Sequence, residues 1–290
     1  MSQYDNIMQL MGSIAVRQNL ERSDTFQNIR DAEFRVFSQF GDDGIIQYLI
    51  RACAIVACEQ RFVEFGVENY AESNTRFLLI NDNWSGLVMD PSEQNIASIS
   101  NDEISWRHDL QSKCCCITPN NINDIFSSAD FARDLGILSI DIDGMDYWVW
   151  KSLVCVEPVV VICEYNSVFG STAKVTVPYK ENFHRGLAHH SNLYFGASLA
   201  ALVDLANTKG YSLIGANSAG NNAYFVRTDR LGNLSAVSAE QGYVESKFRE
   251  SRDETGRLTY IRSLNRVSLI NHMPVYDIES DSVMPLRDAI

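Results

Sequence analysis

The chain has 290 residues, of which 46% are hydrophobic and 21% are charged, so it can form one large α/β domain with an appendage or two small domains. Its formal net charge of -13 argues against nucleic acid or an anionic membrane surface as the main partner, because both are bound through clustered Lys and Arg. No apolar run approaches the roughly 20 residues that span a bilayer, so we expect no membrane insertion.

The N-terminus and the cysteines indicate a cytoplasmic protein. The first 26 residues contain no basic segment followed by a long apolar core, so we expect no signal peptide. Three of the seven cysteines are consecutive, at 114–116, and neighbours on a strand point to opposite faces, so they cannot form one tetrahedral metal site. We interpret the cysteines as small buried apolar residues in a reducing compartment.

In chain order, the first 34 residues predict helices outside the main core, with Ile7, Leu10, Met11 and Ile14 at helical spacing. A buried helix is expected next, with Ser38 as its cap. Short apolar runs then alternate with helical segments as far as a strand pair within 212–227. The predicted strands before that pair lie at 61–67, 85–92, 104–110 or 113–118, 135–143 and 158–166.

This alternation predicts an α/β fold with a doubly wound, mostly parallel sheet. We divide the chain into an N-terminal helical extension over 1–34, a main domain over 35–234 and a C-terminal extension over 235–290. Doubly wound sheets bind ligands at the carboxyl ends of their strands. The sequence is expected to place these polar residues there: Glu64, Asp90, Asp109, Asp141, Asp143, Glu164 and Asn166.

The segment after the first strand, EFGVENYAESNT, lacks the glycines of GxGxxG, and GxxxxGK[ST] is absent, so NAD and ATP are disfavoured. A ligand with a ribose and a cationic centre, such as S-adenosylmethionine, fits better. Asp90 could accept hydrogen bonds from two ribose hydroxyls, and Glu64 and Gly66 could receive the charged amino-acid group. Alternatively, Asp90 only opens the next helix through Pro91.

The two acidic strand ends further along the chain are candidates for a cation site. Asp143, Glu164 and Asn166 would offer oxygen ligands that suit Mg²⁺, Mn²⁺ or Ca²⁺. The alternative is structural: Asp143 or Asp146 caps a helix, and Glu164 pairs with an Arg or Lys.

Four segments, SQFGDDGII, FVEFGV, GLVMDPS and LSIDIDGMDYWVWKSL…PVVVICEYN, resemble those of the FkbM-like family of S-adenosylmethionine-dependent methyltransferases, of the Rossmann-like class, over roughly 36–230. The resemblance implies methyl transfer to a hydroxyl, often on a sugar or secondary metabolite. It assigns Glu64 and Gly66 to the methionine end of the cofactor, Asp90 to the ribose and Asp109 to the adenine region.

The chain departs from the family after Gly66, where VENYAESNT replaces further glycines. We therefore expect additional cofactor contacts from Asp141 and from Ser73, Asn74 and Thr75. The acids that end the fourth and fifth strands are also similar in position to those of metal-dependent O-methyltransferases of the catechol type.

For the chemistry, we expect His189 or His190 to be the base, because three of the five histidines gather in 184–190, or Asp143 to act through a cation. The predicted function is O-methylation of a hydroxyl of a glycan or sugar-containing metabolite. The alternatives are a metal-dependent sugar-nucleotide enzyme, with DID as its cation site, and a non-catalytic binding module. Assembly as a homo-oligomer is compatible with the sequence.

Overall fold

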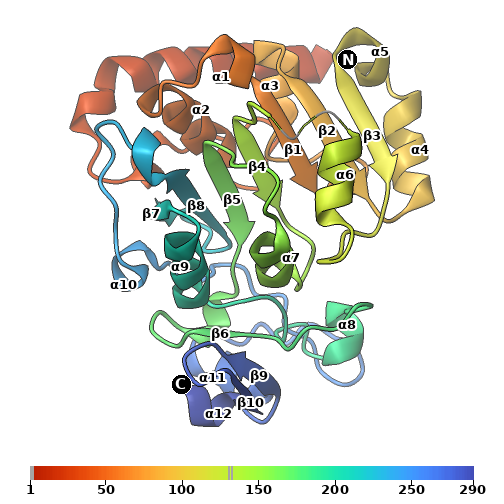
Figure 1. Ribbon diagram of the computed structural model, residues 1–290, viewed down its shortest axis with the longest axis vertical. Coiled ribbons are helices and arrows are strands. Elements are labelled where there is room, and N and C mark those ends of the chain that lie inside the picture. Colours follow the sequence, from red (N-terminus) through yellow and green to blue (C-terminus); the bar gives the residue numbers. More distant parts are fainter. Residues whose placement is uncertain (1–2, 130, 132) are drawn as a thin grey trace.

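The computed structural model describes residues 3–129, 131 and 133–290 (Figure 1). At its centre is a seven-stranded sheet in the order β3-β2-β1-β4-β5-β8-β7. The first five strands of the chain are parallel, β8 runs antiparallel to β5, and β7 runs antiparallel to β8. The predicted doubly wound, mostly parallel sheet of Rossmann-like type is confirmed. The strands are β1 (Arg61–Phe65), β2 (Ser85–Asp90), β3 (Leu110–Cys114), β4 (Ile137–Ile140), β5 (Val160–Glu164), β7 (Tyr211–Ala216) and β8 (Asn222–Arg227).

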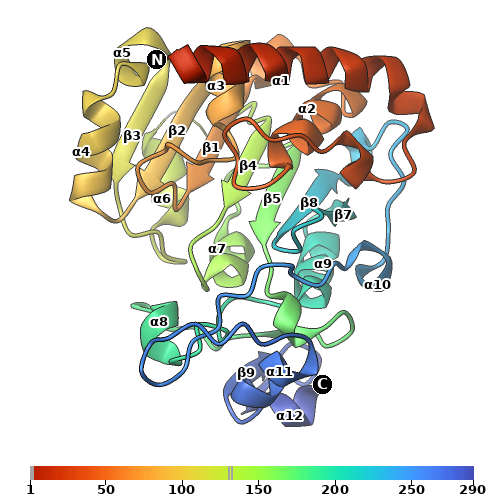
Figure 2. The same cartoon turned by 180° about the vertical axis from the view of Figure 1, so that it is seen from behind.

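Helices cover both faces of this sheet, and the strands supply alternate residues to two separate cores. On β1, Phe62 packs into the core beneath α2 and α3, whereas Val63 packs into the core beneath α6, α7 and α9. Figure 2 shows α1 lying across α2 and α3, which it contacts. The helices are α1 (Gln3–Arg22), α2 (Asp42–Ala52), α3 (Arg76–Asp82), α4 (Glu93–Asn101), α5 (Ile104–Arg107), α6 (Ile122–Ser128), α7 (Asp146–Ser152) and α9 (Leu199–Thr208).

The predicted N-terminal helix is present, but its apolar side is not the predicted one. Ile7, Leu10, Met11 and Ile14 are exposed, and Leu10 has 63% of its surface in solvent. Met8 and Val16 instead pack against the core. Helical spacing alone does not show which of two partly apolar faces packs against the neighbouring helices. Here it is the face that carries Met8 and Val16.

The start of α2 depends on an acid rather than on a serine cap. The N-cap is Gly41 and not the predicted Ser38, although the Ser38 hydroxyl accepts a hydrogen bond from the Asp43 N–H (3.2 Å) in the first turn. Asp43 Oδ2 accepts hydrogen bonds from the backbone N–H groups of Val36, Phe37 and Ser38, and also from the Ser38 hydroxyl. This carboxylate therefore fixes the segment that leads into the helix.

A second, three-stranded sheet lies beyond the carboxyl ends of the main strands (Figure 1). It pairs β6 (Val175–Thr176) with β9 (Pro274–Asp277), which pairs with β10 (Ser282–Pro285). Since β6 lies within 35–234, the predicted main domain and C-terminal extension build this sheet together. The remaining helices are α8 (Arg185–Ala188), α10 (Ala239–Gly242), α11 (Leu264–Ile270) and α12 (Leu286–Ala289), with 3-10 turns at Ser23–Thr25, Ile29–Ala32, Ala57–Glu59, Ser167–Phe169 and Thr228–Arg230.

The structure bears on membrane-spanning helices and on the burial of the cysteines. Among the described helices, none is long and apolar enough to cross a membrane. The seven cysteines are free thiols, and Cys53 and Cys163 are buried as expected. The expectation of burial is wrong for Cys58, Cys114 and Cys116, which are exposed.

Candidate functional site

A cavity of about 800 Å³ lies at the carboxyl ends of β1, β2, β4 and β5, where the strand order reverses between β1 and β4. This is the place at which doubly wound sheets bind ligands. Many of the residues predicted from the sequence line it: Glu64, Gly66, Ser73, Asn74, Asp90, Asp141, Asp143 and Glu164.

Gly66, which directly follows β1, lies in the left-handed region that favours glycine and has no room for a side chain. Its φ is 73°, and a Cβ there would lie 1.7 Å from the backbone oxygen of Asp141. The absence of a side chain therefore lets the loop after β1 approach the loop after β4. These two loops form the floor of the cavity.

The carboxylate of Glu64 organises the loop before α3. Its Oε1 accepts a hydrogen bond from the Asn74 backbone (2.9 Å), and Oε2 accepts from the Ser73 hydroxyl (2.5 Å) and from the backbone (3.1 Å) and hydroxyl (2.5 Å) of Thr75. Burial raises the pKa of Glu64 despite these donors. Ser73 and Asn74 line the cavity beside Glu64, but Thr75 does not.

Asp90 has the structural role considered for it and also lines the cavity. Its Oδ1 accepts from the Ser92 backbone and from Asn95 Nδ2 (both 2.9 Å), which secures the start of α4. Its Oδ2 accepts from the Glu68 backbone N–H (2.9 Å) in the loop after β1. The carboxylate also lines the cavity, together with Asn95.

The placement of Asp109 at a carboxyl strand end is wrong. β3 begins at Leu110, so Asp109 lies at the amino end of the strand, where its carbonyl accepts from the Gly86 N–H. Asp90 is in register with Cys114. The carboxyl end of β3 therefore delivers Cys115, Cys116 and Ile117 to the cavity, and these three line it.

The acids after β4 and β5 meet as predicted, although the set differs by one residue. Carboxylate oxygens of Asp141, Asp143 and Glu164 lie within 4.8 Å of one another. Glu164 has only 8% of its surface exposed, and its Oε2 has no hydrogen-bond partner among the described residues. These three residues are called the acidic cluster below.

Electrostatics leave the acidic cluster short of positive charge. Burial, and then the charge of Asp146, raises the pKa of Asp141 well above its usual range. Burial, and then the charge of Asp141, does the same to the pKa of Glu164. Three converging carboxylates with an unpartnered oxygen fit a hard divalent cation such as Mg²⁺ or Mn²⁺.

Asn166 does not belong to the acidic cluster, which corrects its prediction as a metal ligand. Its Nδ2 donates to the carbonyls of Leu193 (2.8 Å) and Phe195 (2.9 Å), and its Oδ1 accepts from the Val168 N–H (3.0 Å). Both polar atoms of the Asn166 side chain are therefore bonded to the backbone. Alternation along an extended strand predicted that Asn166 would face the same way as Glu164, but β5 ends at Glu164 and a 3-10 turn follows.

The N-cap of α7 is Met145, so Asp146 has a structural role other than the helix cap that was considered for it. Its carboxylate accepts from the backbone N–H groups of Ile142 (2.9 Å) and Gly144 (3.0 Å) and so closes the turn before α7. Burial raises its pKa to about 6.

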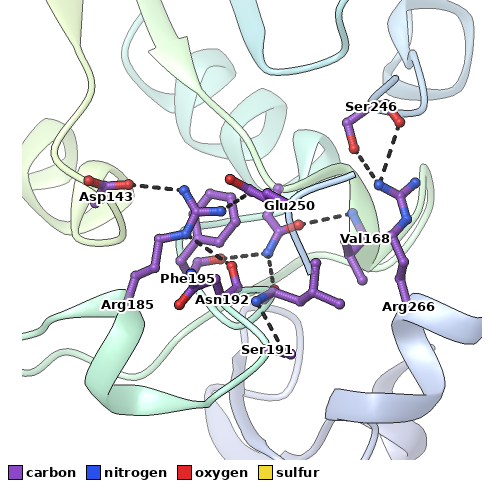
Figure 3. A network of polar contacts seen from close by, with 11 residues as sticks. Asp143, Val168, Arg185, Ser191, Asn192, Phe195, Ser246, Glu250 and Arg266 are labelled. Carbon is purple, nitrogen blue, oxygen red and sulfur yellow. Dashed lines mark hydrogen bonds and ion pairs between the residues drawn. The ribbon is translucent and has the colours of Figure 1, made fainter. Parts of the chain in front are cut away.

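An arginine links the acidic cluster to the C-terminal part of the chain. Figure 3 shows Arg185, from α8, between Asp143 (3.2 Å) and Glu250, with which it forms ion pairs. Its Nε donates to the Asn192 carbonyl (3.0 Å), and its guanidinium lies 3.9 Å from the Phe195 ring centroid. The expected pairing of Glu164 with an Arg is therefore made by Asp143 instead.

Neither His189 nor His190 lines the cavity, so the predicted base is not positioned there. His189 Nδ1 lies 2.8 Å from the Ser191 hydroxyl, and its ring packs on His190 with centroids 4.3 Å apart. Burial, and then the charge of His190, lowers the pKa of His189.

Sequence reasoning missed several residues of the cavity wall. Asn221, in the β7–β8 connection, and Asn222, the first residue of β8, line it. Phe40 and Phe248 also line it, with their rings stacked at a centroid distance of 5.9 Å. Their aromatic character was the available signal, but their separation in sequence hid the pairing.

Comparison with known proteins gives likenesses of fold only. No protein-family model and no curated protein matches the chain. The N-terminal domain of EvdMO1, whose structure was determined in the presence of SAH and D-fucose, is 14% identical with a TM-score of 0.39, over 72% of this chain and 94% of that one. MccD is 8% identical with a TM-score of 0.33, over 59% and 71%. TehB from Haemophilus influenzae is 11% identical with a TM-score of 0.35, over 62% and 61%.

Proposed function

We propose that the protein is an S-adenosylmethionine-dependent O-methyltransferase that acts on a hydroxyl of a glycan or sugar-containing metabolite, with the help of a divalent cation. The observation that carries this proposal is a single cavity that combines Asp90, at the end of β2, with an acidic cluster in which only Asp143 has an ion-pair partner among the described residues. A ligand with a ribose and a positive centre matches both features. A divalent cation matches the second.

The cofactor would occupy the side of the cavity formed by β1, β2 and β3. Asp90 can accept hydrogen bonds from ribose hydroxyls, and Cys116 and Ile117 offer a wall of low polarity for the adenine. Because Glu64 already receives four hydrogen bonds, its carboxylate acts mainly by holding Ser73 and Asn74 in place. Asp141 is therefore the better acceptor for the ammonium group.

The acceptor would enter on the side formed by β4 and β5. Asp141, Asp143 and Glu164 would hold Mg²⁺ or Mn²⁺, which when bound lowers the pKa of an acceptor hydroxyl and orients it. Phe248 and Asn222 supply a ring and an amide to the same wall, which suits the apolar face and the hydroxyls of a sugar. Proximity and alignment of the hydroxyl are the main contribution of this wall.

The test is calorimetric titration with S-adenosylmethionine and S-adenosylhomocysteine, with and without Mg²⁺. Asp90→Ala should weaken binding by about 1.5–3 kcal/mol, the value of a hydrogen bond to a charged group. Glu164→Gln should abolish the magnesium effect but retain cofactor binding. No binding by the wild type in either condition would overturn the proposal, and unchanged affinity in Asp90→Ala would remove Asp90 from the site.

One observation also favours a metal-dependent sugar-nucleotide enzyme. Asp141 and Asp143 of the DID sequence both belong to the acidic cluster, as a cation site for a diphosphate would require. Titration with a nucleoside diphosphate sugar and Mn²⁺ separates the two candidates. Binding of that ligand without binding of S-adenosylmethionine would favour this alternative.

A further inference from the structure

The segment 244–250 of the C-terminal extension separates two cavities. Phe248 and Glu250 line the large cavity described above. The intervening Lys247 and Arg249 are exposed and line a second cavity of about 370 Å³. Over 247–250, successive side chains therefore alternate between this second cavity, called the outer pocket below, and the candidate active site.

The outer pocket is strongly cationic in a chain whose net charge is -13. Lys247, Arg249, Arg262 and Arg266 line it, and Glu245 is the one acid among its described lining residues. The hydroxyls of Ser246 and Ser263 add hydrogen-bond donors. An exposed row of cations is often only a solvated face, but this pocket also contains a buried cation.

Arg266 is the buried part of the pocket, with 4% of its surface exposed (Figure 3). It donates to Ser246 Oγ (2.5 Å) and to Glu245 Oε1 (2.7 Å). Its Nε has no hydrogen-bond partner among the described residues. Burial removes water from this guanidinium, and one half-exposed carboxylate and an incomplete set of hydrogen bonds replace only part of that hydration.

We propose that this outer pocket binds a phosphate group. A tetrahedral oxyanion accepts several hydrogen bonds at once, which matches the two serine hydroxyls and the exposed cations, and the buried guanidinium of Arg266 adds a fixed positive charge beside them. The group could be carried by a phosphorylated acceptor whose sugar reaches the large cavity, or it could be free inorganic phosphate. Only the first source rests on the proposed function.

The test is calorimetric titration of the full chain with inorganic phosphate at low ionic strength, without S-adenosylmethionine. The double variant Lys247→Gln/Arg262→Gln leaves the buried Arg266 in place. The matched control Arg17→Gln/Arg287→Gln removes the same charge from exposed positions outside the pocket. We expect saturable binding by the wild type and the control, and affinity weaker by roughly 10-fold or more in the pocket variant, as for the loss of charge-assisted hydrogen bonds.

Equal binding by the two double variants, or no saturable binding by the wild type, would overturn the phosphate site. Glucose 1-phosphate then separates the two sources. Tighter binding than inorganic phosphate, with the gain lost in Phe248→Ala, identifies a phosphorylated acceptor. Equal affinities identify phosphate itself. Because S-adenosylmethionine is absent, failure of this test and failure of the methyltransferase proposal are distinguishable.

Discussion

At the scale of single residues, the cavity depends on side chains whose polar groups are already in use and on a few that are not. Glu64, Asp146 and Asn166 are tied to the backbone, so they shape the loops around the cavity. Glu164 retains a buried oxygen that has no hydrogen-bond partner in the described part of the chain. A cation binds most favourably at a carboxylate such as Glu164, because it neutralises a buried charge that has no other partner.

Gly66→Ala should lower the free energy of unfolding by about 3 kcal/mol or more, because the added Cβ meets the Asp141 carbonyl in a left-handed conformation. Gly210→Ala, just after α9, is the matched control, since Gly210 has a similar φ of 79° but no neighbour within 4 Å of a Cβ among the described residues. It should cost about 1 kcal/mol from backbone conformation alone. Denaturant titration compares the two. Equal losses would mean that the close approach to β4 does not constrain the fold.

At the scale of elements, a buried acid connects the N-terminal segment to α2. Asp43→Ala leaves three backbone N–H groups and a hydroxyl without their acceptor. We expect it to lower the free energy of unfolding by about 3 kcal/mol or more, since several charge-assisted hydrogen bonds are lost together. Asp24→Ala, in the 3-10 turn after α1, removes an acid outside this network and should cost little. A near-neutral Asp43→Ala would show that residues 36–38 hold their conformation without it.

The elements also show what can be predicted from the sequence. The strand runs are apolar and end in acids, so the sheet and the meeting of Glu64, Asp90, Asp141 and Glu164 follow from pattern alone. Asp109 was misplaced because two neighbouring segments each looked like a strand, and the register with β2 decides between them.

Other parts of the site depend on contacts that no local pattern encodes. Phe248 and Glu250 reach the cavity from the C-terminal extension, where the sequence shows no strand or helix period. The three clustered histidines looked like catalytic groups because of their composition. The fold turns His189 toward Ser191 and His190 instead.

At the scale of the whole molecule, buried acids make stability depend on pH. Burial raises the pKa of Asp146 to about 6 and raises those of Asp141 and Glu164 well above their usual range. The folded protein therefore holds protons that the unfolded chain has released, so its stability falls as pH rises from the usual carboxyl range through the raised values. We expect a lower Tm for the metal-free protein at about pH 8.5 than at about pH 6.5.

Glu164→Gln should reduce this difference in Tm, because it removes one of the groups that bind protons in the folded state. Mn²⁺ should also reduce it in the wild type, since the cation replaces the protons at the higher pH. Scanning calorimetry at the two pH values measures both effects. A Tm that rises with pH in the metal-free wild type would contradict the raised pKa values.

The ion pairs of Arg185 have a consequence for how the protein is made. A ribosome delivers the chain from its N-terminus, so Asp143 and Arg185 emerge well before Glu250 does. Until then, Arg185 has one of its two carboxylate partners, and the segment that carries Phe248 is absent from the cavity wall. The nascent protein can therefore assemble its central sheet first, whereas its binding cavity is complete only after the segment with Phe248 and Glu250 has emerged.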